Sequence, residues 1–188
     1  MIVAISGSLR HESVNSAALR AAERWATRSG MEFAIAEHLA QLPHFNPDRE
    51  GDAPDAVRAF RSALEDADAV VMAVPEYAFG IPGAFKNALD WTVGSGSLDG
   101  KCVAVLSVAP PGRGSDVRHA LGRVLTAVNV QVSYHSVPVA PSDRDEDGEI
   151  RNPAVICNLG KLVTTLSERS EAAERWTPSF ADSQRPGS

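Results

Sequence analysis

Three stretches of the chain are almost wholly apolar and rich in alanine and valine: residues 1–6, 67–74 and 101–108. Strands buried on both faces of a parallel sheet have this composition, because neither face needs a polar side chain. Two weaker apolar segments, 31–38 and 129–139, bring the number of predicted strands to five.

Segments with helical periodicity separate these strands. Residues typical of helix starts precede them, for example Asn15, Asp55, Ser115 and the Asn152-Pro153 pair, and Gly30 is placed to end the first helix. The predicted helices cover residues 15–29, 55–66, 82–93, 115–128 and 153–169.

Strict alternation of strand and helix predicts βαβ units and a doubly wound sheet. We expect a flavodoxin-like α/β fold, a three-layer α/β/α sandwich whose five parallel strands have the order 2-1-3-4-5. The predicted domain spans residues 1–170, and residues 171–188 are expected to form a polar C-terminal tail. Ligands of such sheets bind beyond the carboxyl ends of the strands, where the strand order reverses.

The loop after the first strand, SGSLRHESVN, is unusually polar. It runs into a predicted helix, and a helix N-terminus offers unpaired N–H groups and the positive end of a dipole to an anion. Arg10 adds a charged donor, and several hydroxyls and an amide add neutral ones. A helix cap alone would need one of these residues, so the cluster predicts a phosphate site.

The loop after the third strand begins at residue 75. Together with the predicted helix that follows, it has the sequence PEYAFGIPGAFKNALDW, residues 75–91. Pro82 suits the first turn of a helix, and Gly80 and Gly83 permit a close approach to the backbone. Placed at the same edge of the sheet as the phosphate loop, this partly aromatic segment could lie against a flat ring. Phe85, Leu89 and Trp91 are expected to pack in the core instead.

Together, GSLRHESVN and PEYAFGIPGAFKNALDW resemble the two motifs of the NADPH-dependent FMN reductase family, which includes quinone, azo-dye and chromate reductases. The resemblance covers about residues 1–168. It implies an oxidoreductase with FMN as cofactor and NADPH or NADH as co-substrate. The expected location is the cytoplasm, because the cysteine count and the start of the sequence give no secretory signal. Hydride would pass through the flavin to a flavin, quinone, azo or similar small acceptor. It also implies a homodimer or tetramer.

The family pattern assigns roles by position in this sequence. Around the FMN phosphate it implies Ser8, Arg10, Ser13, Asn15 and Ser16. Along the isoalloxazine ring and the ribityl chain it implies Pro75, Glu76 and Tyr77 with the backbone of Ala78 and Phe79. At the other edge of the ring it implies Ser107, Gly112 and Gly114, with Arg118 as a further candidate. Arg113 or Arg118 could contact the 2′-phosphate of NADPH, or could be solvated loop residues.

Three positions depart from the family pattern. Ala78 replaces the usual asparagine, Gly80 replaces the usual serine, and the third loop has GRG where two adjacent glycines are common. The phosphate loop itself is intact.

Composition excludes several other classes. The net charge of −6 argues against broad nucleic-acid binding, no apolar run approaches the length of a membrane span, and no basic leader precedes the first strand. Two cysteines are too few for a disulfide framework. The segment 143–150 matches the start of an EF-hand loop, but Ala154 stands where that loop needs glutamate, so we expect a charged turn and no metal site.

Two alternative functions remain open from the residues. One is an electron carrier on the same fold, although the T-x-T-G-x-T phosphate loop of such carriers is absent. The other is a non-catalytic protein that binds a different phosphorylated ligand. No catalytic triad or carboxylate dyad is evident, which suits a flavin enzyme because the cofactor carries the chemistry.

Overall fold

The computed structural model describes residues 1–10, 12–36 and 38–176. Five strands form one parallel sheet in the order β2-β1-β3-β4-β5, which confirms the predicted fold and strand order. The strands are β1 (Ile2–Ser6), β2 (Phe33–Ala36), β3 (Ala69–Ala73), β4 (Cys102–Ser107) and β5 (Gln131–Ser136).

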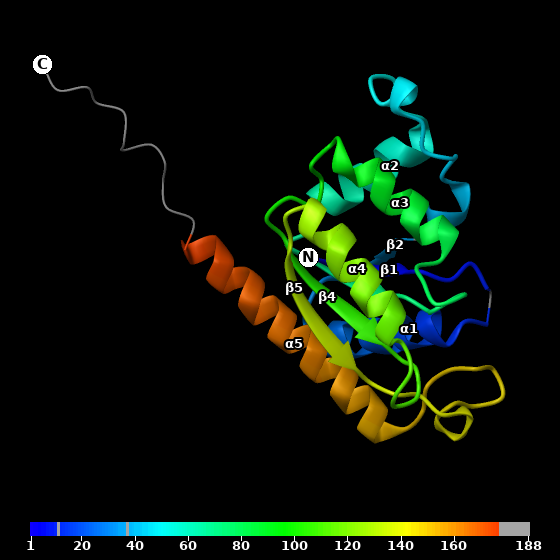
Figure 1. The fold of residues 1–188 in the computed structure, drawn as a ribbon. Helices are drawn as coiled ribbons and strands as arrows, with labels where there is room; N and C mark the ends of the chain where they lie inside the picture. Colours follow the sequence, from blue (N-terminus) through cyan, green and yellow to red (C-terminus); the bar gives the residue numbers. More distant parts are fainter. Residues whose placement is uncertain (11, 37, 177–188) are drawn as a thin grey trace, which may run out of the picture.

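Helices cover both faces of this sheet, giving three layers (Figure 1). Helices α1 and α5 pack on one face, and α2, α3 and α4 pack on the other. The α-helices are α1 (Val14–Arg28), α2 (Asp55–Glu65), α3 (Gly83–Val93), α4 (Ser115–Ala127) and α5 (Pro153–Trp176), and the 3₁₀ turns are η1 (His38–Gln41), η2 (Pro47–Arg49) and η3 (Pro141–Asp143).

The strands divide their side chains between two apolar cores. In β1, Ile2 and Ala4 face α1 and α5, whereas Val3 and Ile5 face the three helices of the opposite layer. Successive side chains of a strand point to opposite faces, so a strand covered on both sides must be apolar throughout. Trp91 is fully buried in the core between the sheet and helices α2, α3 and α4, which confirms its predicted packing role.

The pairing register brings the ends of the central strands level with one another. Ser6 at the end of β1 pairs with Ala73 at the end of β3, and Ala73 neighbours Leu106 of β4. The loops after these three strands therefore gather at one edge of the sheet, together with the segment that links β5 to α5 (Figure 1).

The predicted bounds of the first four helices agree with the structure to within one residue, but α5 extends well beyond its predicted end. Helix α1 begins one residue early and is capped by Ser13, not Asn15, because the Ser13 hydroxyl accepts a hydrogen bond from the Asn15 N–H at 3.2 Å. Helix α5 continues past residue 169 to Trp176. Ser170 is only 5% exposed and donates a hydrogen bond to the carbonyl of Asp68 at 2.8 Å, which anchors this last part of the helix to the sheet.

The predicted domain boundary at residue 170 falls inside this helix. Residues 177–188, the larger part of the predicted tail, lie outside the described residues.

The EF-hand-like segment forms a charged turn, as predicted. Asp145 accepts hydrogen bonds from two backbone N–H groups and from Arg151, and Asp143 accepts from Asn152. These carboxylates are occupied by protein donors. No group of three His, Cys, Asp or Glu side chains suited to a metal ion occurs within the described residues.

Candidate functional site

A groove of about 300 Å³ lies where three loops meet at the carboxyl edge of the sheet. We call it the central groove. Its walls come from the start of α1, from the loop after β3 and from the loop after β4. It is lined by Val14, Asn15, Val74, Pro75, Glu76, Ser107, Val108, Ala109, Pro110, Arg113, Gly114, Val117 and Val139.

Asn15 is the buried polar side chain of this groove. It is only 7% exposed, yet its Oδ1 atom has no hydrogen-bond partner among the residues that the structure describes. A buried amide oxygen without a donor is costly, and such groups occur where a ligand that can donate completes the hydrogen bonding. The first turn of α1 adds its free backbone N–H groups to this position.

Three of the other predicted phosphate ligands line a second hollow next to the first loop, whereas Ser13, the N-cap of α1, lines neither hollow. Ser8, Arg10 and Ser16 line this second hollow of about 790 Å³, the outer cleft. The Ser8 hydroxyl accepts a hydrogen bond from the Arg10 N–H at 3.3 Å. The Arg10 side chain is in no ion pair found among the described residues, so its guanidinium is available to an anion.

The first and second loops touch each other closely. A Cβ atom on Gly7 would lie 3.0 Å from the Val74 side chain and 3.2 Å from the ring of Pro75, so a larger residue at position 7 would push the loops apart. The Tyr77 hydroxyl lies 3.4 Å from the Ser8 hydroxyl. The first two motifs of the sequence are thus in direct contact.

The second loop contains a tight hairpin. Tyr77 and Gly80 exchange both backbone hydrogen bonds, at 3.2 and 3.0 Å, and Ala78 and Phe79 at the tip have φ of 48° and 59°. Tyr77 is 53% exposed and Phe79 is 81% exposed. Tyr77, Ala78 and Phe79 line neither the central groove nor the outer cleft, so their cofactor role stays a prediction.

Glu76 connects the second loop to α4. Its Oε2 atom accepts hydrogen bonds from the N–H groups of Asp116 and Val117 at 3.0 and 3.1 Å. Of the second-loop residues that the sequence assigned to the cofactor, Pro75 and Glu76 line the central groove.

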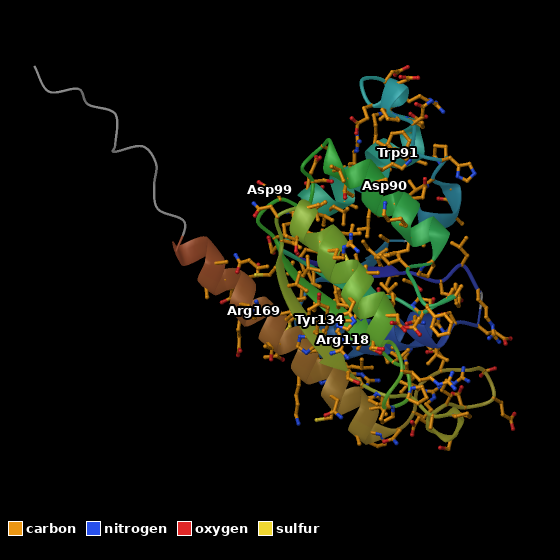
Figure 2. All side chains as sticks on the ribbon, viewed as in Figure 1. Asp90, Trp91, Asp99, Arg118, Tyr134 and Arg169 are labelled. Carbon is orange, nitrogen blue, oxygen red and sulfur yellow. The ribbon has the colours of Figure 1, made fainter. Side chains whose placement is uncertain are left out.

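The third loop forms the opposite wall. Ser107 and Gly114 line the groove. Gly114 has φ of 84°, and a Cβ atom added to it would lie 3.2 Å from Oγ of Ser107. Gly112 lies in a neighbouring hollow of about 130 Å³ with Arg118 and Tyr134. The Arg118 guanidinium stacks over the Tyr134 ring at 5.9 Å, from α4 to β5 (Figure 2).

Charged groups around these hollows are partly neutralised by one another. Glu149, in the segment before α5, accepts hydrogen bonds from Arg20 and Arg24 of α1, both at 2.6 Å. Burial raises the pKa of Glu149, but the hydrogen bonds from Arg24 and Arg20 outweigh it and hold the pKa below its usual value. Burial also lowers the pKa of His135, and the charge of Arg169 lowers it further.

Sequence reasoning missed three groups at this edge. The Ser6 hydroxyl lies 2.9 Å from that of Ser16, Gly7 permits the contact between loops, and Glu149 forms a wall of the outer cleft. Ser6 and Gly7 could have been found from the sequence, because a polar residue and a glycine follow directly on an apolar strand. Glu149 had no such signal, because its partners lie 129 and 125 residues away in the chain.

Known proteins resemble this chain in sequence and in fold. Residues 1–143 match the sequence model of a family described as NADPH-dependent FMN reductase. A probable NADPH:quinone oxidoreductase 2 of Oryza sativa subsp. japonica is 32% identical over 181 residues, which cover 88% of this chain and 86% of that protein. A quinone reductase of Pseudomonas putida is 32% identical over 159 residues, covering 80% and 84%.

Solved structures agree with these sequence matches. The flavoenzyme NAD(P)H:(acceptor) oxidoreductase FerB of Paracoccus denitrificans superposes with a TM-score of 0.78 at 27% identity, covering 92% of this chain and 97% of that one. A flavodoxin, WrbA-like protein of Agrobacterium tumefaciens has a TM-score of 0.57 at 14% identity, covering 92% and 97%, and shows the shared fold.

Proposed function

The chain belongs to the NADPH-dependent FMN reductase family, and from this membership and the site we propose how it works as an oxidoreductase. The protein is a flavin-dependent NAD(P)H oxidoreductase with FMN as its cofactor. For the acceptor we propose a quinone, since the two relatives described above are both named for quinone reduction.

The residues at the carboxyl edge of the sheet suit FMN. The observation that carries the proposal is the buried Oδ1 atom of Asn15, at the start of α1 in the central groove. It is an acceptor without a donor among the described residues, and a ribityl hydroxyl of FMN could donate to it. The N–H groups of that helix end, the hydroxyls of Ser8 and Ser13 and the Arg10 guanidinium supply the donors that a phosphate needs. We therefore assign the phosphate to the first loop and the ring to the space between the second and third loops.

Bound FMN supplies the ring that takes up hydride from NAD(P)H and delivers it to the acceptor. The protein's own residues do the binding and orientation. Pro75 and Ser107 line opposite walls of the groove, so a flat ring between them would be held in one plane. Tyr77 and Phe79 are exposed at the hairpin of the second loop, where they could offer aromatic surface to a planar acceptor.

The test is an absorption spectrum of the purified protein, alone, with added FMN, and then with NADPH under nitrogen. We expect a bound-flavin spectrum that bleaches with NADPH and recovers when a quinone is added. Bound flavin that stays oxidised in NADPH and in NADH would favour an electron carrier. Absence of FMN binding would overturn the proposal and leave a protein for another phosphorylated ligand.

We further propose that the protein is a homodimer formed through α3 and α4. A shallow surface between these helices is mostly apolar, with Ile81, Val93 and Val124 on it, and Val93 is 54% exposed. Lys86 and Asp90 on this surface are paired with each other within the chain, and Arg123 of a second copy could join Asp90 across a two-fold axis. Sedimentation equilibrium should give a dimer for the wild type and a monomer for Val93→Asp.

A cytoplasmic location is also proposed. Cys102 and Cys157 are both free thiols, which suits a reducing compartment. Separately, none of the helices in the described part of the chain is long and apolar enough to cross a membrane. Fractionation of cells that express a tagged protein would test the location.

A further inference from the structure

Helix α4 receives its N-terminal cap from a distant loop. Its own N-cap residue is Gly114, which has no side chain to accept a hydrogen bond. Glu76, 40 residues earlier in the chain, accepts from the N–H groups of Asp116 and Val117 in the first turn. A carboxylate at this position also interacts favourably with the positive end of the helix dipole.

This cap is the link between two walls of the central groove. No other hydrogen bond joins residues 74–82 to residues 108–118 in the part of the chain that is described. Glu76 and Gly114 both line the groove. The two hydrogen bonds that Glu76 accepts therefore help to set the distance between the second and third loops, together with the apolar core that Val74 and Val117 share.

Tyr77, the residue after Glu76, contacts the first loop, on the other side of the second loop from α4. Tyr77 reaches the Ser8 hydroxyl in the first loop at 3.4 Å, whereas Glu76 reaches α4. Adjacent residues of an extended segment point in opposite directions, so one dipeptide can hold loops on both of its sides. The contact of Tyr77 is long for a hydrogen bond, and the two bonds of Glu76 are of ordinary length.

We propose that Glu76 is a positioning residue for the cofactor: by capping α4 it holds the second and third loops at a fixed separation before FMN binds. The inference rests on the proposed function, because the groove is taken to receive the flavin ring. Its physical basis is preorganisation, since loops that are already in place lose less conformational freedom when the ligand enters.

The experiment compares three variants with the wild type in FMN titrations followed by quenching of flavin fluorescence. Glu76→Ala removes both hydrogen bonds. Glu76→Gln keeps an acceptor oxygen of similar reach. Asn152→Ala is the matched control, because the Asn152 side chain accepts from the Ala154 N–H at 2.9 Å and so caps α5, outside the groove. Thermal unfolding of each apo protein measures the general loss of stability.

Amide hydrogen exchange of the apo proteins gives a second readout, independent of FMN. We expect Glu76→Ala to lose the protection of the Asp116 and Val117 amides, and Glu76→Gln to retain part of it. In the titrations we expect the dissociation constant of FMN to rise about tenfold or more in Glu76→Ala, equivalent to about 1.4 kcal/mol, and about threefold or less in Glu76→Gln. Asn152→Ala should lose stability without losing FMN affinity.

Unchanged FMN affinity in Glu76→Ala would overturn the inference, as would an equal loss in Asn152→Ala, which would show that general destabilisation is the cause. If Glu76→Ala does not fold, Glu76→Asp replaces it, because the shorter side chain keeps the charge and loses the reach. Failure of the proposed function is distinguishable, since then the wild type would bind no FMN while the exchange difference at Asp116 and Val117 would persist.

Discussion

Ala78 and Phe79 are neighbours at the tip of the second loop, and both have positive φ, 48° and 59°. This is the backbone of a type I′ turn, which favours asparagine, aspartate or glycine at both positions. Neither residue here belongs to that group. The hairpin therefore carries backbone strain beside the site, and asparagine, the residue that the family pattern has at position 78, would relieve it.

Ala78→Asn should stabilise the protein by about 0.5–1 kcal/mol, because asparagine tolerates the left-handed region better than alanine does. Thermal unfolding should show a rise of about 2 °C. Gly30→Ala is the reverse control: Gly30 has φ of 72° with no neighbour within 4 Å of its Cβ position, so that variant should lose about 1 kcal/mol. An unchanged melting temperature in Ala78→Asn would contradict the strain argument.

Arg10→Ala should weaken FMN binding by about tenfold or more, because a charge-assisted hydrogen bond to the phosphate is lost. The affinity of the wild type should fall with added salt, and that of the variant should fall less steeply. Both are measured by fluorescence titration. Arg28→Ala, in the last turn of α1 at the far end of the helix, serves as the control and should bind FMN like the wild type.

Glu149→Gln should reduce stability in a pH-dependent way. The pKa of Glu149 is lower in the folded protein than its usual value, so the carboxylate contributes stability above the unfolded pKa, and this contribution is lost as the pH falls through the folded pKa. We expect the variant to lose about 1–2 kcal/mol at neutral pH, where Arg20 and Arg24 are left without their partner.

The difference between this variant and the wild type should shrink at acidic pH, as the pH falls through the lowered folded pKa of Glu149. Urea denaturation at neutral and acidic pH measures it. Glu146→Gln changes an exposed carboxylate of the same turn and should have little effect at either pH. A pH-independent loss in Glu149→Gln would show that the side chain acts through packing instead of charge.

Gly114→Ala should be more damaging than Gly112→Ala. Both glycines have positive φ, 84° and 82°, so each variant loses about 1 kcal/mol from backbone strain. Only at Gly114 would the new Cβ also lie 3.2 Å from Ser107 Oγ, whereas at Gly112 nothing lies within 4 Å. We expect a larger drop in melting temperature and weaker FMN binding for Gly114→Ala, and equal effects of the two changes would remove the Ser107 contact from the explanation.

Patterns local in the chain predicted most of the fold. The apolar strands and the polar first loop were readable because each depends on neighbouring residues and on the period of a strand or helix. The end of α5 was not, since Ser170 is held by a hydrogen bond to Asp68, 102 residues away. The cap of α1 was misplaced by two residues, because Ser13 and Asn15 are equally good capping residues.

The sequence by itself determined the five parallel strands, their order, the three loops at one edge and the resemblance that identifies the family. Only the tertiary structure decided which of those loop residues meet. Glu76 was assigned to the ring from its motif, but folding also makes it the cap of α4, and Tyr77 and Phe79 lie outside the groove itself. Contacts of this kind join residues 40 or more positions apart, and no local pattern encodes them, because they depend on how the strands bring the loops together.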